Sequence, residues 1–435
     1  MKYTSDIEAS INSPDRLEVL YQNARAANEE NEFRSDIQAA YEKSPDNILL
    51  LAWHSRFEHI PVSKPKRATN WALAVFLGIV TGLILWVISD PTLLFLGQVP
   101  YLIILWSPIA AIPVMLFLAL ASKKNYLYTA ISVIGLIIAS IYILLISSTM
   151  SHSTAKDYLT LMVFQLPLLC WMGIGIAVLR FKSTTSNRFA FLIKSIEVMI
   201  TAGVYLIFGV AFGLITLGMF AALNITLPQL VMRLIAAGGF GLIPIMAVAT
   251  MYDPQANPDA QDFNQGLSKF VFTIMRLLLP LTLIVLVIYL FVIPFNFTAP
   301  FENRNLLIVY NVMQFAIIGL LLGATPLKLD DLSSNLQLWL RRGIIAVSIL
   351  ALVISLYALS AVVYRTVLDS LTLNRLTIIG WNIINIAILC AMIYTQFRKL
   401  SAPWHERLQN VFSKATTAYL VWSVFLILAL PILFR

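Results

Sequence analysis

The sequence contains a series of long apolar runs, each of a length that can cross a lipid bilayer. A helix crossing a hydrocarbon core of about 30 Å needs about 20 apolar residues. By this rule we predict eleven spans, at residues 71–89, 101–121, 126–148, 158–180, 196–222, 230–251, 270–293, 305–324, 341–364, 374–396 and 416–434. The runs are continuously apolar and do not alternate with polar residues, which excludes transmembrane strands. The predicted fold is therefore an all-α, polytopic transmembrane helical bundle.

Charged residues are unevenly distributed along the 435 residues. They make up 12% of the chain, and hydrophobic residues make up 59%, whereas soluble proteins have about 25% charged and about 45–50% apolar residues. Residues 1–69 nevertheless hold 20 of the 52 charged side chains. We therefore expect a small N-terminal cytoplasmic helical head, residues 1–69, followed by a transmembrane helical domain, residues 70–435.

The head contains two helix-start signals, Ser13-Pro14-Asp15 and Ser44-Pro45-Asp46. Each combines a capping hydroxyl, a proline for the first turn and an acid near the positive end of the helix dipole. Apolar residues follow both signals at helical spacing. Two roles remain open for the head: a helical cap on the membrane domain, or a module that binds a cytosolic protein. The spacing of His54 and His59 is poor for a metal site.

The distribution of Lys and Arg predicts that the N-terminus is cytoplasmic. With that orientation, 18 of these residues flank the inner ends of the spans and 6 flank the outer ends, as the positive-inside rule requires. The first long apolar run begins near Trp71, too late for a signal peptide. Eleven spans place the C-terminus outside, although one misassigned span, giving ten or twelve, would reverse that side.

Six polar residues in the spans form a candidate polar cavity: Glu197, Arg233, Asn311, Gln314, Asn382 and Asn385. Polar groups at membrane depth are costly, so they are expected to face the bundle interior. Each amide pair is spaced three residues apart and shares one helix face. An alternative is that the amides form interhelical hydrogen bonds. In the same alternative, Glu197 pairs with Lys194 at the headgroup level and Arg233 extends to the interface.

Small and helix-breaking residues are concentrated in the spans. Glycines lie four apart at Gly78/Gly82, Gly209/Gly213 and Gly319/Gly323, the spacing of closely packed membrane helices. Two further stretches could break helices, as in transporter sites, or only kink them: Pro108 with Pro113, and the glycines 238, 239 and 241 with Pro244. Residues 187–197 could form a surface helix before the fifth span, and the acidic segment 252–269 is expected to be a solvated connector.

A second candidate site lies at the predicted outer face, where Arg365, Asp369 and Arg375 form a cluster; a salt-bridged loop is the alternative. We identify no catalytic residue, no metal site and no cofactor motif. An integral-membrane transferase would need an acid or histidine at the outer surface, for which Asp90, His152 and Asp369 are the local candidates.

The C-terminal half resembles a family of multi-spanning bacterial inner-membrane proteins known only as a domain of unknown function. The resemblance rests on Val210 to Pro254, with Phe220-Ala221-Ala222-Leu223-Asn224-Ile225, and on Phe270 to Phe301, with Leu279-Pro280-Leu281 and Tyr289. Its most distinctive piece is Leu371-Thr372-Leu373-Asn374-Arg375. The resemblance implies a location in the bacterial inner membrane and a shared helical bundle, but no activity.

These observations favour a non-enzymatic membrane protein for transport or for lipid or envelope handling. The alternative is a signalling or assembly scaffold that recruits a cytosolic partner through the head. The lipid bilayer is the expected surrounding partner. Nucleic acid is not, because the basic residues lie between apolar runs rather than in one stripe.

Overall fold

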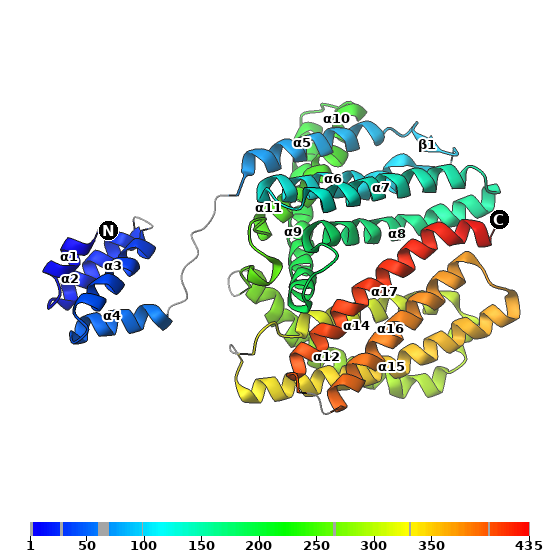
Figure 1. The fold of residues 1–435 in the computed structure, drawn as a ribbon. Coiled ribbons are helices and arrows are strands. Elements are labelled where there is room, and N and C mark those ends of the chain that lie inside the picture. The colour runs from blue at the N-terminus through cyan, green and yellow to red at the C-terminus, as the bar shows by residue number, and fades with distance from the viewer. Residues whose placement is uncertain are drawn as a thin grey trace. The chain divides into compact units, whose positions relative to one another are not determined.

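The computed structural model describes residues 3–26, 29–59, 69–97, 99–263, 267–329, 332–398 and 401–434. The chain contains two compact units, Met1–Thr69 and Asn70–Arg435 (Figure 1). Eleven helices of the described chain are long and apolar enough to cross a membrane. The prediction of an all-α polytopic bundle is confirmed, and the chain is a multi-pass integral membrane protein.

The first unit is a bundle of four short helices: α1 (Thr4–Ala9), α2 (Pro14–Ala26), α3 (Glu30–Lys43) and α4 (Ile48–His59). Apolar faces of all four meet in one core, where the rings of Tyr21, Phe33, Trp53 and Phe57 lie within 5.4–6.2 Å of one another. The two proline-containing start signals precede α2 and α4, as predicted. Helix α1 lacks such a signal and was not predicted.

The second unit contains the candidate spans. They are α5 (Trp71–Ile88), α6 (Tyr101–Ser122), α7 (Tyr126–Ser147), α8 (His152–Leu179), α9 (Thr185–Ala222), the segment Gln229–Met251, α12 (Leu267–Val292), α14 (Arg304–Ala324), α15 (Ser334–Asp369), α16 (Leu373–Phe397) and α17 (Trp404–Leu433). Most of them run side by side, and α5 begins at the opposite end of this unit from the end of α17 (Figure 1).

Short elements complete the second unit. The segment Gln229–Met251 consists of α10 (Gln229–Arg233), a π-helical turn η1 (Leu234–Gly238) and α11 (Gly239–Met251). The remaining elements are β1 (Leu94–Phe95), which pairs antiparallel with β2 (Val99–Pro100), η2 (Pro258–Ala260), η3 (Ile293–Asn296) and α13 (Ala299–Glu302).

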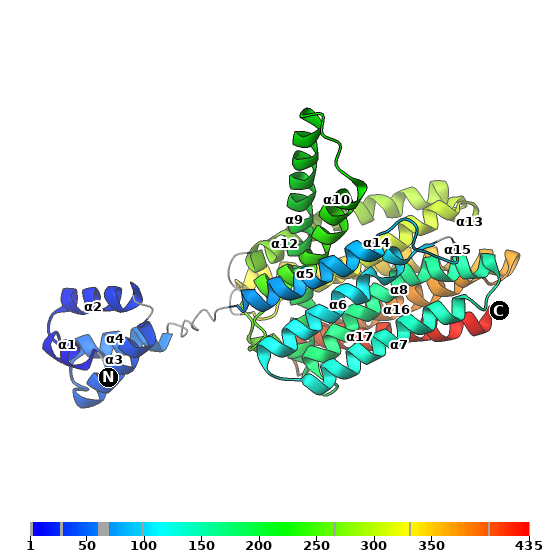
Figure 2. The ribbon, with the colours of Figure 1, turned by 90° about the horizontal axis from the view of Figure 1, so that it is seen from above.

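Helix α9 differs from the prediction. Residues 187–197 do not form a separate surface helix, because they belong to one continuous helix of 38 residues whose first turns are buried, at Phe189 and Leu192 among others. At 1.5 Å per residue this helix is about 57 Å long, nearly twice the hydrocarbon thickness. Figure 2 shows it projecting from the bundle across the direction of its neighbours.

The predicted breaks do not interrupt the chain direction. Pro108 and Pro113 lie inside the continuous helix α6. The π-helical turn η1 ends at Gly238, the first residue of the glycine-rich stretch, and the helix then continues as α11 through Pro244. A π-helical turn accommodates an extra residue without ending the helix, so the local change is a bulge rather than a broken span.

Glycines bring α5 and α11 into backbone contact. A Cβ added at Gly82 would lie 2.5 Å from the carbonyl oxygen of Gly238, and one at Gly241 would lie 2.6 Å from the Cα of Gly82. The other two predicted glycine pairs are not equivalent. Gly209 and Gly319 face open space, whereas Gly323 packs against Met275.

Candidate functional site

An apolar cavity of about 320 Å³ lies between helices α6, α8, α9 and α11. Its walls include Ala110 from α6, Cys170 from α8, Ala202 from α9 and Pro244 from α11. Small side chains and two prolines in this region leave space that larger residues would fill. The volume is at the lower end of the range of about 300–1,000 Å³ that is typical of small-molecule sites.

The cavity opens toward the apolar surface of the bundle. Two of its lining residues, Trp106 and Met199, are 42% and 70% exposed, respectively. They belong to α6 and α9, so the opening lies between these two helices. Both exposed side chains are apolar, so this part of the cavity borders the apolar surface of the bundle.

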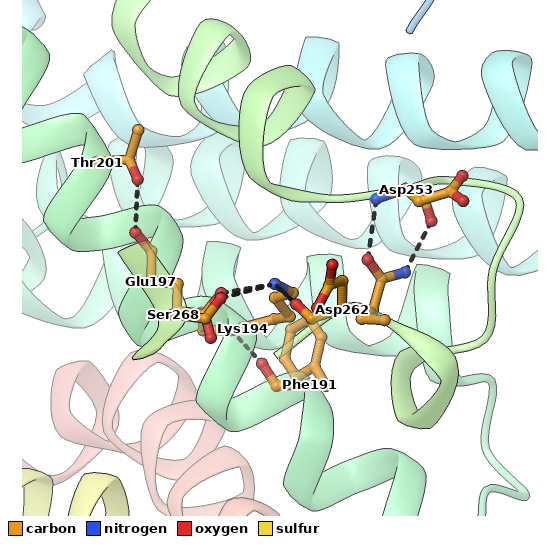
Figure 3. Close-up of polar contacts among 9 residues, drawn as sticks. Phe191, Lys194, Glu197, Thr201, Asp253, Asp262 and Ser268 are labelled. Carbon is orange, nitrogen blue, oxygen red and sulfur yellow. Dashed lines mark hydrogen bonds and ion pairs between the residues drawn. The ribbon is translucent and has the colours of Figure 1, made fainter. Parts of the chain in front are cut away.

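A buried ion pair borders the cavity (Figure 3). The ammonium of Lys194, a lining residue, donates to Glu197 Oε2 at 2.6 Å, to the carbonyl oxygen of Asp262 at 2.7 Å and to Ser268 Oγ at 3.4 Å. Ser268 Oγ in turn donates to Glu197 Oε2 at 2.7 Å. The Lys194 side chain is 5% exposed and that of Glu197 is fully buried. The predicted pair therefore forms inside the protein rather than at its surface.

The same lysine fastens the segment that joins α11 to α12. Besides the bond from Lys194 to the Asp262 carbonyl, Asp259 N donates to Asn187 Oδ1 of α9 at 3.1 Å. The buried Gln261 closes the segment on itself, because Asp253 N donates to its Oε1 and its Nε2 donates to the Asp253 carbonyl (Figure 3). Asp259 and Asp262 are exposed, as a solvated connector predicts, whereas Pro258 and Gln261 of the same segment are buried.

The four amides of the candidate polar cavity bond across α14 and α16. Asn382 Nδ2 donates to Asn311 Oδ1 at 2.8 Å, and Asn385 Nδ2 donates to Gln314 Oε1 at 3.3 Å. Tyr419 of α17 donates to Asn385 Oδ1 at 2.6 Å. This ladder ties three helices together, which fits the interhelical alternative. A ligand role for these amides stays a prediction.

Glu197 and Arg233 do not join the amides through any bond of the described residues. Arg233 instead pairs with Asp90 at 2.7 Å and also donates to the Trp86 carbonyl and to Ser89 Oγ. The hydroxyl and amide of Thr92 donate to Asp90 Oδ1 and, together with Arg233, lower the pKa of Asp90 to about 2. This contact fastens the end of α5 to α10.

The predicted outer cluster forms in part. Arg375 pairs with Asp369 at 2.7 Å and also donates to the Ser370 carbonyl. Arg365 lies on α15, like Asp369, but no hydrogen bond or ion pair among the described residues joins it to the Asp369–Arg375 pair. The two contacts join the end of α15 to the start of α16, as the salt-bridged alternative expects.

Three features of these sites were missed from the sequence: the Asp90–Arg233 pair, the contribution of Tyr419 and the apolar cavity. Asp90 was predicted at the outer surface and Arg233 at the membrane interface, so their opposite charges were a signal that could have suggested this pair. Tyr419 lies in the last span and donates to Asn385 of α16. The need of the buried Asn385 oxygen for a donor was the available signal. Nothing in the sequence marked the cavity, because its mostly apolar walls come from four helices that are far apart in the sequence.

Comparison of the chain with protein-family models, with curated proteins and with solved structures returns no match. The resemblance to a bacterial inner-membrane family therefore stays a prediction. Among the described residues, no group of three or more His, Cys, Asp or Glu side chains could hold a metal ion. The functional argument therefore depends on the geometry of this chain.

Proposed function

We propose that the transmembrane unit binds an apolar chain, such as that of a lipid or another amphiphile, in the cavity between α6, α8, α9 and α11. The observation that carries this proposal is a cavity of about 320 Å³ that lies inside the spans and borders the lipid-facing surface. The function is transport or lipid and envelope handling, in which the protein removes this molecule from its bilayer surroundings.

The polarity of the walls supports an apolar occupant. Lys194 is the one charged side chain among the described lining residues, and its ammonium already has two short bonds, to Glu197 and to the Asp262 carbonyl. A ligand charge placed here would compete with these contacts. An alkyl or isoprenoid chain needs no polar partner. Because it comes from the bilayer, its binding is driven by van der Waals packing against the walls rather than by the hydrophobic effect.

The dimensions also fit a chain-like ligand. The lining residues on α6 extend from Trp106 to Leu118, which corresponds to about 18 Å along a helix. We place the C-terminal end of α6, near Leu118, on the cytoplasmic side of a bacterial inner membrane, together with the C-terminal ends of α8 and α11. The Lys and Arg count of the connecting segments supports that orientation.

A photoreactive lipid with a diazirine in its acyl chain tests the proposal on the full chain in lipid nanodiscs. We expect cross-links to concentrate on the cavity walls and to fall several-fold in the cavity-filling variants Ala110→Phe and Ala202→Phe. These two residues belong to different helices, so misfolding of one variant leaves the other as a test.

Leu116→Phe is the matched control, because Leu116 is on α6 but is 37% exposed and does not line the cavity. Its labelling should equal that of the parent chain. Uniform labelling of all lipid-facing helices, unchanged by both filling variants, would overturn the proposal.

The alternative function, a scaffold that recruits a cytosolic partner through the head, is supported by the compact four-helix unit with its own core. Deletion of residues 1–60 distinguishes the two. Lipid cross-linking should persist in the truncated chain if the cavity carries the function. Loss of a pulled-down partner with unchanged cross-linking would assign a separate binding role to the head.

A further inference from the structure

A second, polar cavity of about 270 Å³ adjoins the apolar one. It lies where α6 turns into α7 and α8 into α9, beside the segment after α11. Three residues line both cavities: Leu118, Val178 and Tyr252. They are found at the ends of α6, α8 and α11, so the polar cavity continues the apolar one along the helix direction.

The polar cavity is basic. Its lining includes Lys124, Arg180 and Lys182, and it includes no carboxylate among the described residues. None of the three forms an ion pair within the part of the chain that the structure describes. All three cations are exposed, and an anion bound in the cavity would be attracted by each of them.

Local structure holds one of these cations in place and adds neutral donors. Arg180 Nε donates to Asn125 Oδ1 at 2.6 Å, which ties the α8–α9 turn to the α6–α7 turn. Ser183 and Thr184 line the same cavity at the start of α9. The N-terminus of a long helix adds a partial positive charge. Guanidinium, ammonium and hydroxyl groups together are typical partners of phosphate oxygens.

We propose that this basic cavity binds the phosphate headgroup of an anionic lipid whose chain occupies the apolar cavity. The inference rests on the proposed function and names its ligand class. The two cavities differ in polarity. Lys194 is paired with Glu197 and is not available for a headgroup. Lys124, Arg180 and Lys182 have no acidic partner among the described residues. The wall of Leu118, Val178 and Tyr252 marks the level at which the headgroup meets the chain.

The test uses the full chain in nanodiscs and native mass spectrometry of retained lipid. Phosphatidylglycerol should be retained about tenfold more than phosphatidylcholine. The triple variant Lys124→Gln, Arg180→Gln, Lys182→Gln should lose this preference. The matched control Lys123→Gln, Arg342→Gln, Lys414→Gln removes the same charge outside both cavities and should keep it. Equal loss in both triple variants, or no preference in the parent chain, would overturn the inference.

Inorganic phosphate is the second probe and distinguishes a lipid headgroup from a free anion. We expect millimolar phosphate alone to leave the melting temperature unchanged and the lipid to raise it. Stabilisation by phosphate without lipid preference would assign the cavity to a soluble anion and overturn the lipid inference. Failure of the headgroup preference with intact acyl-chain cross-linking would leave the proposed function standing, whereas loss of cross-linking would remove both.

Discussion

At the scale of single residues, the contact between Gly82 and Gly241 sets how closely α5 and α11 approach. Gly82→Ala should destabilise the protein by about 1–3 kcal/mol, because the new methyl group would meet backbone atoms that cannot rotate away. Thermal unfolding in detergent measures the change. Gly209→Ala is the control, since a Cβ there meets nothing within 4 Å. Equal melting temperatures for both variants would contradict the close packing.

The buried pair of Lys194 and Glu197 gives a second residue-scale prediction. Lys194→Met should cost about 3–5 kcal/mol, because it leaves the Glu197 carboxylate buried without its cation. The double variant Lys194→Met, Glu197→Leu should recover most of that loss, since no charge then remains to be desolvated. Unfolding measurements on the three proteins give the coupling. If the double variant were no more stable than Lys194→Met, the unpaired Glu197 carboxylate would not be the cause of the lost stability.

At the scale of elements, the Asp90–Arg233 contact fastens α5 to α10 and makes stability depend on acid pH. The pKa of Asp90 is lower in the folded protein than its ordinary value of 3.8. Its stabilising effect is therefore complete above that value and is lost as the pH falls toward about 2. The melting-temperature difference between the parent chain and Asp90→Asn should be constant from pH 8 to pH 5 and shrink below pH 4. A difference that persists at pH 2 would contradict this assignment.

The sequence predicts elements better than it predicts their contacts. Each apolar run corresponds to a helix because spanning length depends on hydrophobicity along the chain. The ends differ where polar residues continue a helix beyond the apolar run: the run 341–364 became Ser334–Asp369. Helix α9 was misjudged because its amphipathic first turns are also compatible with a surface helix. Its burial depends on tertiary contacts such as that of Phe189 with Phe412.

The candidate sites show the same division. Spacing placed Asn311 and Gln314 on one helix face and Asn382 and Asn385 on another, and these faces meet in the structure. Local pairs three residues apart, such as Lys194 and Glu197, are also accessible from spacing. The cavities depend on which helices are neighbours. That arrangement is determined by packing among apolar side chains whose sequence signals are nearly equivalent.

At the scale of the whole molecule, the head is expected to fold without the membrane unit. Residues 1–59 should unfold cooperatively with a stability of no more than about 3–5 kcal/mol, since a core of this size supplies little more. Phe33→Ala should abolish the transition, because truncating a buried Phe costs about 3–5 kcal/mol. Circular dichroism measures both. Val19→Ala, at a position that is 58% exposed, should change the melt little, and a fragment without a cooperative transition would contradict an autonomous head.

The opening between Trp106 and Met199 has a consequence for how occupancy depends on concentration. A ligand that enters from the hydrocarbon phase never crosses bulk water on its way to the site. Its occupancy then follows its mole fraction among the surrounding lipids, not its amount per volume of solution. Adding carrier lipid or detergent at fixed total ligand should therefore empty the site by dilution in two dimensions. Doubling the aqueous volume should leave the occupancy unchanged.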